Sequence, residues 1–230
     1  MIETAIEVRG LAKSFLLHNQ GGAELHVLRK RSFDVYPGEC LALQGRSGSG
    51  KSTLLKCLYA NYRASAGSIR IGDTEVTTAS PRELLQLRRD VVGYVSQFLR
   101  VIPRVPALAV VSEPLLDDGP YDESAALRAR HEAEQLLLRL RIPMRLWSVA
   151  PATFSGGEQQ RINIARGLIR KRPVLLLDEP TASLDAENRA SVVAMINEAR
   201  EQGAAVVGIF HDREVRDAVA TRVLDMEARA

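Results

Sequence analysis

The stretch GRSGSGKST, residues 45–53, decides the fold. It matches the phosphate-binding pattern G-x-x-x-x-G-K-[ST]. The apolar run CLALQG (40–45) precedes it, and a helical pattern, KSTLLKCLYANY (51–62), follows it. A strand, a glycine loop and a helix in this order begin an α/β unit. A glycine-rich turn with a chance lysine is therefore the weaker interpretation.

This loop supplies the first candidate binding residues. Glycines let backbone N–H groups approach phosphate oxygens because no Cβ stands in the way. The N-terminus of the helix that follows favours anions. Lys51 is expected to reach the β- and γ-phosphates, and the Ser52 hydroxyl is expected to bind Mg²⁺. The candidate nucleotide-binding residues here are Gly45, Ser47, Gly48, Ser49, Gly50, Lys51, Ser52 and Thr53.

The apolar stretch VLLLDEP (174–180) ends in two carboxylates. Such an arrangement suits phosphoryl transfer, in which one acid supports Mg²⁺ and another group handles the attacking water. Asp178 is the candidate Mg²⁺ residue and Glu179 the candidate general base. A strand that ends in Asp-Glu is often only a solvated strand end. Beside a phosphate loop, the functional interpretation is favoured.

The stretch FSGGEQQRINIARGL (154–168) places a Ser-Gly-Gly turn before a basic helix. A helix N-terminus with bare glycines is a second anion site. Ser155, followed three residues later by Glu158, also matches a capping box, which is a purely structural feature. Both interpretations can hold together.

Composition places limits on the class of protein. The chain has 230 residues and a net charge of +3, which is too mild to predict nucleic-acid binding. Cys40 and Cys57 lack metal-site spacing and are expected to be buried, reduced thiols of a cytoplasmic protein. No segment is long and apolar enough to predict membrane insertion, although docking onto a membrane protein stays open.

Apolar patterning predicts the layers of the fold. The continuous apolar runs 174–179 and 204–210 are typical of a parallel sheet covered on both faces. From about Arg82 to Ile142 the pattern is mostly helical. The sequence therefore predicts an α/β protein with a helical insertion.

The order of the motifs resembles that of ABC-type ATPases. GRSGSGKST is followed by Gln97, SGGE, LLLDEP, SLD and a histidine after a strand. The resemblance covers essentially the whole chain and implies a P-loop, RecA-like parallel core with an N-terminal antiparallel β subdomain and an inserted helical subdomain. It implies one domain, 1–230, in which about 1–84 and 166–230 form the catalytic core and about 85–165 the helical signature subdomain.

The same resemblance implies ATP and Mg²⁺ as ligands and assigns roles to single residues. Phe15 resembles the aromatic residue that stacks on adenine. The alternative, that Phe15 is an ordinary core residue, is equally well supported. Gln97 resembles the hinge glutamine that links the Mg²⁺ and water site to the helical subdomain. His211 resembles the switch histidine that contacts the γ-phosphate.

A further set of residues implies a dimer. Ser155, Gly156 and Gly157 resemble the signature that contacts ATP held by the opposite subunit. Asp185, in SLD, resembles a residue of the loop that crosses the dimer interface. It could instead cap the helix that begins near Ala186. The implied dimer is head-to-tail, either of two copies or with a related ABC ATPase. The common signature has Leu first and Gln last, whereas this one reads FSGGE. ATP binding is expected to persist, and the turnover rate stays open.

The stretch SQFLRVIPRVP (96–106) raises the question of the partner. In transporters of this family, the segment after the hinge glutamine helps to form the groove for a coupling helix. The prolines disfavour continuous helix, and arginines beside aliphatic residues suit an interface. An ordinary surface loop would explain the prolines equally well.

Four stretches point to a narrower resemblance. VSQFLRVIPRVPAL, LYANY, ATFSGGEQQRINIARG and VVGIFHD resemble the L-subunit family (PhnL) of the bacterial carbon–phosphorus lyase system. This implies an ATPase that works with soluble lyase subunits in phosphonate degradation, supporting formation of α-D-ribose 1-(methyl)phosphonate 5-triphosphate as a possible synthase subunit. The alternative is the ATPase subunit of a membrane exporter of the lipoprotein-release or cell-division type. A role on DNA or ribosomes is disfavoured because such proteins carry tandem domains or long insertions.

Overall fold

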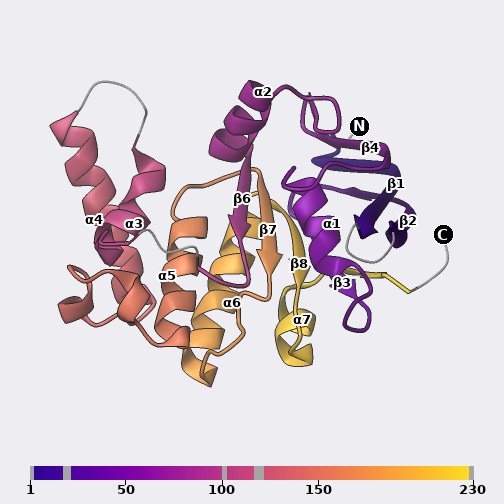
Figure 1. The fold of residues 1–230 in the computed structure, drawn as a ribbon. Helices are drawn as coiled ribbons and strands as arrows, with labels where there is room; N and C mark the ends of the chain where they lie inside the picture. The colour runs from indigo at the N-terminus through magenta and orange to yellow at the C-terminus, as the bar shows by residue number, and fades with distance from the viewer. Residues whose placement is uncertain (1–2, 18–21, 100–102, 117–121, 228–230) are drawn as a thin grey trace.

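Two sheets form the framework of the computed structural model, which describes residues 3–17, 22–99, 103–116 and 122–227 (Figure 1). The first sheet is parallel, with strand order β6-β7-β8-β3-β9. Its strands are β3 (Cys40–Gln44), β6 (Val92–Val95), β7 (Val174–Asp178), β8 (Ala205–Ile209) and β9 (Arg222–Asp225). The second sheet is antiparallel, with order β2-β1-β4-β5. Its strands are β1 (Ile6–Leu17), β2 (Ala23–Val35), β4 (Ala66–Ile71) and β5 (Thr74–Glu75).

The parallel sheet separates two apolar cores. Every residue of β7 and β8 is buried, as their continuous apolar sequence predicts. Successive side chains of a strand point to opposite faces. Leu175 and Leu177 join the core beneath the later helices, whereas Val174 and Leu176 join the core shared with α1 and the antiparallel sheet. The strands are therefore fixed on both faces, which holds their carboxyl ends in place.

Helices cover both faces of this sheet. In Figure 1, α1 lies beside β3 and the antiparallel sheet, and α3, α4 and α5 lie toward the opposite end of the molecule. The longer helices are α1 (Lys51–Leu58), α4 (Glu123–Arg139), α5 (Gly156–Leu168) and α6 (Ala186–Glu201). The shorter ones are α2 (Pro81–Gln86), η2 (Leu87–Val91), α3 (Ala107–Ser112), η3 (Glu113–Leu115), η4 (Met144–Leu146), η5 (Pro151–Thr153) and α7 (Arg213–Val219).

One segment inside the region predicted to be mostly helical forms a strand instead. β6, inside the stretch predicted to be mostly helical, is a strand that pairs with β7. A Cβ added to Gly93 would lie 2.7 Å from Leu175 Cδ2, so the strand packs tightly against its neighbour. Short length and an internal glycine hid this strand from the pattern. The division into a core and a signature subdomain with a boundary near residue 85 stays a prediction.

Part of the expected partner segment cannot be placed. Arg100, Val101 and Ile102 lie outside the described residues. After them the chain turns at Arg104, whose φ is +66°, and α3 begins directly after Pro106. None of the helices within the described ranges combines the length and the hydropathy that a bilayer-spanning segment needs.

The two cysteines yield a prediction about reactivity. Both are free and buried, and burial raises the pKa of Cys40 to about 12 and that of Cys57 to about 11. Because the thiolate is the reactive form, we expect almost no modification of the native protein by iodoacetamide at pH 8, and modification of both thiols after unfolding. Mass spectrometry of the labelled protein measures this. Rapid labelling of the native chain would contradict the buried positions.

Candidate active site

The phosphate loop joins β3 to α1 and requires glycine at two positions. Gly45 has φ +149° and Gly50 has φ +93°. An added Cβ at Gly45 would lie 2.7 Å from Ser49 Oγ, and one at Gly50 would lie 2.8 Å from Leu28 Cδ2. Gly50 caps α1 without any side-chain hydrogen bond to the first N–H groups of the helix. The loop therefore leaves backbone donors for an anion. Ser47, Gly48 and Ser49 lie in the same loop, and Ser52 and Thr53 lie in the first turn of α1.

The polar side chains of the loop fit a phosphate group. Lys51 Nζ donates to two neutral carbonyls, that of Gly45 at 2.7 Å and that of Arg46 at 2.8 Å. The Ser49 hydroxyl is buried and has no hydrogen-bond partner within the described part of the chain. Buried polar groups normally find partners, so an unpaired hydroxyl in this loop is consistent with a ligand oxygen.

Asp178 ends β7 beside the loop. Its side chain is buried, and its carboxylate accepts from Ser52 Oγ at 3.1 Å and from Tyr94 Oη at 3.4 Å. Burial raises the pKa of Asp178; the Ser52 hydrogen bond opposes this rise, and the charge of Glu179 adds to it. Oxygen atoms of this kind suit Mg²⁺. Among the described residues no group of three or more His, Cys, Asp or Glu side chains could hold a metal alone. Mg²⁺ at Ser52, Gln97 and Asp178 would thus depend on phosphate and water oxygens for its remaining ligands.

Glu179 stands at the centre of the polar cluster. Its φ is +55°, a costly conformation for a residue with a side chain. Its carboxylate lies 2.7 Å from His211 Nε2 and accepts from Gln97 Nε2 at 3.2 Å. The His211 side chain is 67% exposed and that of Glu179 only 16%. The structure thus brings together the three predicted residues, from the ends of β6, β7 and β8, at one partly sheltered point.

Two contributors to this cluster escaped the sequence analysis. Gln160, on α5, is buried and donates through Nε2 to the carbonyl of Pro180 at 3.1 Å, which fixes the turn after Glu179. Tyr94, on β6, contacts Asp178. The sequence signal that could have drawn attention to Tyr94 was its place three residues before Gln97. Only the pairing of β6 with β7, however, brings the Tyr94 hydroxyl to the Asp178 carboxylate.

The N-terminus of α5 is capped as the sequence predicts. The backbone N–H of Glu158 donates to Ser155 Oγ at 3.4 Å. In return, the backbone N–H of Ser155 donates to Glu158 Oε2 at 2.9 Å. Hydrogen bonds from Ser155 lower the pKa of Glu158. A Cβ at Gly157 would lie 3.0 Å from the Ser183 carbonyl oxygen, whereas one at Gly156 would meet nothing within 4 Å.

Asp185 has the capping geometry that its position predicts. It precedes α6 and accepts from the backbone N–H and the Nδ2 of Asn188, both at 2.8 Å. These bonds lower the pKa of Asp185. The interface role implied for this residue stays a prediction.

The two candidate phosphate sites do not meet within one chain. Within the described ranges, no hydrogen bond or ion pair joins Ser155, Gly156 or Gly157 to the loop 45–53. Figure 1 shows α1 and α5 on different sides of β7 and β8. The described structure thus shows no direct contact between the phosphate loop and the signature turn of the same chain.

Phe15 lies on β1, outside both apolar cores. Its ring meets Tyr62 edge-on, with ring centroids 5.2 Å apart and an interplanar angle of 80°. Lys13 Nζ lies 4.7 Å from the Phe15 ring centroid. The position favours an accessible aromatic over the alternative of a core phenylalanine.

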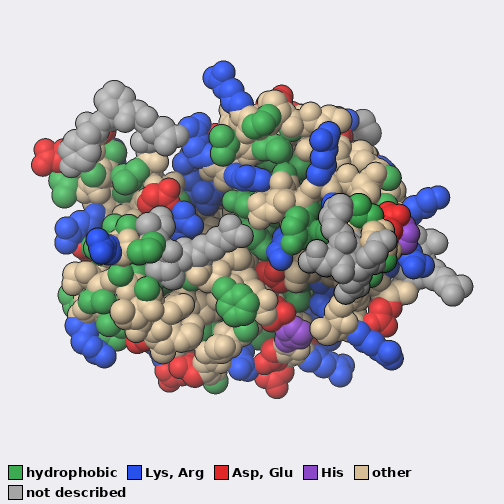
Figure 2. Space-filling view, viewed as in Figure 1, with side chains coloured by type: hydrophobic (Ala, Val, Ile, Leu, Met, Phe, Trp, Pro, Cys, Tyr) green, Lys and Arg blue, Asp and Glu red, His purple; other side chains and the backbone are tan. Residues whose placement is uncertain are grey.

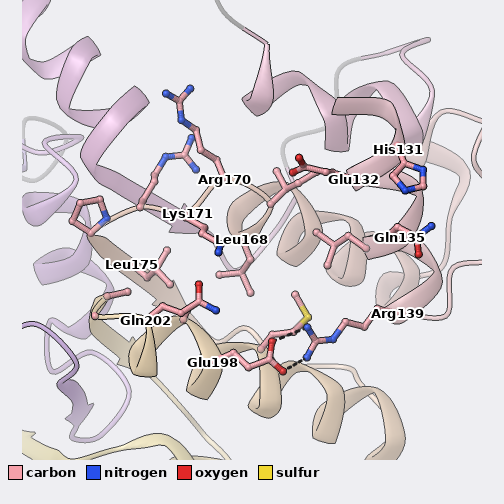
Figure 3. Close-up of a pocket in the computed structure, with 18 residues that line it drawn as sticks. His131, Glu132, Gln135, Arg139, Leu168, Arg170, Lys171, Leu175, Glu198 and Gln202 are labelled. Atoms are coloured by element: carbon pink, nitrogen blue, oxygen red, sulfur yellow. Dashed lines mark hydrogen bonds and ion pairs between the residues drawn. The ribbon is translucent and has the colours of Figure 1, made fainter. Parts of the chain in front are cut away.

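A wide cleft in the described part of the chain lies away from these residues. It has a volume of about 900 Å³ and lies between α4, α6 and the chain that follows α5 (Figure 3). Leu168 and Leu175 line it, and two hydrogen bonds of 2.8 and 2.5 Å between Arg139 and Glu198 span one side. Cleft volume alone therefore does not indicate the candidate active site, which lies at the carboxyl ends of β6, β7 and β8.

Comparison with known proteins identifies the family. Residues 28–182 match the family described as ABC transporter. The chain belongs to this family. It is 36% identical, over 94% of its length and 92% of the relative, to the lipoprotein-releasing system ATP-binding protein LolD of Idiomarina loihiensis. It is 35% identical over 96% of its length to the macrolide export ATP-binding/permease protein MacB of Escherichia coli K12, of which it spans 33%.

Solved structures confirm the fold. The dimeric structure of MJ0796, a bacterial ABC transporter cassette, has a TM-score of 0.86 and 28% identity, covering 96% of this chain and 93% of that one. A second structure of MJ0796, described as a dimeric post-hydrolysis state bound to ADP and Pi, gives the same values. The predicted α/β architecture of the ABC ATPase nucleotide-binding domain is thus confirmed, and the family supports ATP binding and hydrolysis.

The narrower resemblance is corrected by the same comparisons. A role beside soluble carbon–phosphorus lyase subunits, with ribose phosphonate triphosphate synthesis, is contradicted because the matching relatives are named as export and lipoprotein-release proteins. The physical reason lies in what the motifs do. The loop 45–53, the signature 155–157 and the acidic strand end bind and position ATP, which all such ATPases share, so they carry no information on the partner.

Asp178 yields a prediction of opposite effects on stability and binding. Because the folded state raises its pKa, the contribution of this carboxyl to stability is present at low pH and is lost as the pH rises through the folded pKa. We expect Asp178→Asn to melt at least about 2 °C higher than the wild type at pH 7.5, with little difference at pH 4. Mg²⁺-dependent ATP binding is expected to weaken. Thermal melts across this range and fluorescent-nucleotide titrations with and without Mg²⁺ measure both effects. A lower melting temperature at pH 7.5 would contradict the burial cost.

Proposed function

We propose that this chain is the ATP-hydrolysing subunit of a membrane exporter of the lipoprotein-release type. The observation that carries the proposal is the Glu179 carboxylate held between Gln97 and His211, beside Asp178 and the phosphate loop. This supplies a base next to a phosphate site. The likeness to LolD over nearly the full length of both proteins supports the exporter context.

The residues divide the hydrolytic work among them. The loop N–H groups and Lys51 bind the phosphates, and Ser52, Gln97 and Asp178 would hold Mg²⁺, which when bound offsets phosphate charge. Glu179 orients a water molecule and takes its proton. The water oxygen forms a bond to the γ-phosphorus while the bond to the β–γ bridging oxygen breaks, and ADP and phosphate result.

Two further residues position the reactants. His211 holds the Glu179 carboxylate and is exposed enough to reach the γ-phosphate. Phe15 provides a ring face for adenine, and Tyr62 steadies that ring through its edge-on contact.

The working unit in this proposal is a head-to-tail dimer of two copies. The signature Ser155, Gly156 and Gly157 of one copy completes the ATP site on the phosphate loop of the other, and Asp185 lies at the interface. The separation of the two sites within one chain and the dimeric neighbour structures support this. ATP closes the dimer and hydrolysis opens it, which is a population shift driven by the ligand. The dimer lies on the cytoplasmic side, bound to the membrane subunit.

Purification from the native host tests the exporter context. Tagged Glu179→Gln, which keeps ATP bound, is recovered from detergent-solubilised membranes in ATP and Mg²⁺. We expect an integral membrane protein to accompany it, and the same protein to stimulate hydrolysis by the wild type. Lys51→Ala, which cannot hold the phosphates, is the control. Recovery of soluble partners alone, unchanged by detergent, would overturn the exporter proposal while leaving the ATPase intact.

A further inference from the structure

The carboxylate of Asp178 is held at both of its oxygens. Ser52 Oγ donates to Oδ1 at 3.1 Å, and Tyr94 Oη donates to Oδ2 at 3.4 Å. Ser52 lies in the first turn of α1, whereas Tyr94 lies on β6, which pairs with β7 in the parallel sheet (Figure 1). The two donors therefore reach Asp178 from different elements, and only the serine belongs to the phosphate-loop motif.

We propose that Tyr94 is a positioning residue for the metal site. Its hydroxyl fixes the rotation of the Asp178 carboxylate, so that Oδ1 faces Ser52 and a divalent cation. The inference rests on the proposed ATPase function, and it adds a residue that raises the affinity for the cation. Tyr94 acts through Asp178 and not by contact with the nucleotide.

A carboxylate needs such a restraint because its two oxygens are chemically equal. The last side-chain torsion of aspartate is broad, so an unrestrained carboxylate turns easily. Outer hydrogen bonds orient metal-binding carboxylates, and their loss typically costs about 10- to 100-fold in metal affinity or activity. The Tyr94 bond is long for an O–H···O hydrogen bond. We therefore expect an effect near or below the lower end of that range.

Burial makes the Tyr94 hydroxyl hard to replace with water. Asp178 is only 3% exposed. In the space-filling view of Figure 2, Asp and Glu side chains are sparse at the surface over the region that β6 and β7 occupy in Figure 1. A buried acceptor that loses its donor is costly to leave unsatisfied. Removing the hydroxyl would thus take this donor from Oδ2 and free the carboxylate to turn.

The ring of Tyr94 is itself fixed by packing. It lies against Tyr59, with ring centroids 4.8 Å apart and an interplanar angle of 34°. Tyr59 is the C-cap of α1, the helix that carries Ser52 in its first turn. The Arg88 guanidinium lies 5.0 Å from the Tyr59 ring centroid, and Arg88 Nε donates to the Tyr59 carbonyl at 3.1 Å. Both donors to Asp178 are therefore placed by the same helix.

Metal binding tests the inference directly. Mn²⁺ is the probe because it takes the same kind of oxygen ligands as Mg²⁺, and EPR spectroscopy counts the free ion. The protein is loaded with AMP-PNP, a non-hydrolysable ATP analogue, so that turnover does not contribute. We expect Tyr94→Phe to need at least about threefold more Mn²⁺ for half-saturation than the wild type. In EDTA the variant is expected to bind the analogue normally.

Tyr59→Phe is the matched control. It removes a hydroxyl from the ring that packs on Tyr94 and leaves the bond to Asp178 in place. We expect it to bind Mn²⁺ as the wild type does. Equal loss in the two variants would overturn the positioning role, because it would assign the effect to the packing of the rings. Thermal melts show that both variants are folded.

A double variant tests the route through Asp178. Asp178→Asn alone is expected to weaken Mn²⁺ binding. Adding Tyr94→Phe to it is expected to cause less than about a twofold further loss, because two residues that act through one contact are not additive. A further loss as large as that in the wild-type background would overturn this route.

The same samples separate this inference from the proposed function. Phosphate release from ATP and Mg²⁺ is measured for the wild type beside the EPR titration. If the wild type hydrolyses ATP and Tyr94→Phe has the same Mn²⁺ affinity, the role of Tyr94 is overturned and the ATPase proposal stands. A wild type that neither hydrolyses ATP nor binds Mn²⁺ beside the analogue would overturn both.

Discussion

Glu179→Gln is expected to lower the rate of ATP hydrolysis by about two to four orders of magnitude while leaving ATP binding unchanged. Glutamine keeps the shape of the side chain and can still meet Gln97 and His211, but it cannot take a proton from water. Phosphate release gives the rate, and nucleotide retained after gel filtration gives the binding. We expect ATP to stay bound to the variant.

The control for this variant is Glu201→Gln, at the exposed end of α6, which is expected to hydrolyse ATP normally. A wild-type rate for Glu179→Gln would contradict the assignment of the base. Loss of ATP binding would show that the carboxylate supports the nucleotide and does not act on water.

Gly156→Asp is expected to reduce hydrolysis by at least about 100-fold without weakening ATP binding to the single chain. The position accepts a side chain, since an added Cβ meets nothing within 4 Å, so the fold should keep its melting temperature. The new carboxylate would stand at the helix N-terminus where the phosphate of the opposite copy is expected. Phosphate release and fluorescent-nucleotide titration measure the two effects.

Gly157 is the poorer choice for this test, because its added Cβ would lie 3.0 Å from the Ser183 carbonyl oxygen and could disturb the fold. An active Gly156→Asp variant would contradict the signature role. A variant that fails to bind ATP as a monomer would place this turn within the same chain's own nucleotide site.

Local patterns predicted the parts of the fold that depend on local chemistry. Continuous apolar runs gave β7 and β8, and the caps at Ser155 and Asp185 follow from side chains that reach their own helices. β6 was missed because a short strand that contains Gly93 gains its stability from its neighbour and not from its own pattern. For the same reason Tyr94 and its contact with Asp178 could not be foreseen.

The candidate site, too, has parts that the local sequence predicts and parts that only the tertiary structure shows. Motif order singled out Gln97, Glu179 and His211, and the sequence put Glu179 and His211 at strand ends. The parallel sheet, which includes the unpredicted strand β6, brings all three side chains together. The partner could not be predicted in this way, because the motifs respond to ATP and not to the partner.

Mixing two inactive variants tests the central claim most directly, namely that each ATP site is built from two copies. Lys51→Ala removes the phosphate-loop cation, and Gly156→Asp blocks the signature. A mixed dimer would keep one site with both halves intact. We predict that each pure variant is inactive and that the mixture regains ATP hydrolysis, measured as phosphate release. A mixture that stays inactive at protein concentrations where the wild type hydrolyses ATP would contradict the shared site.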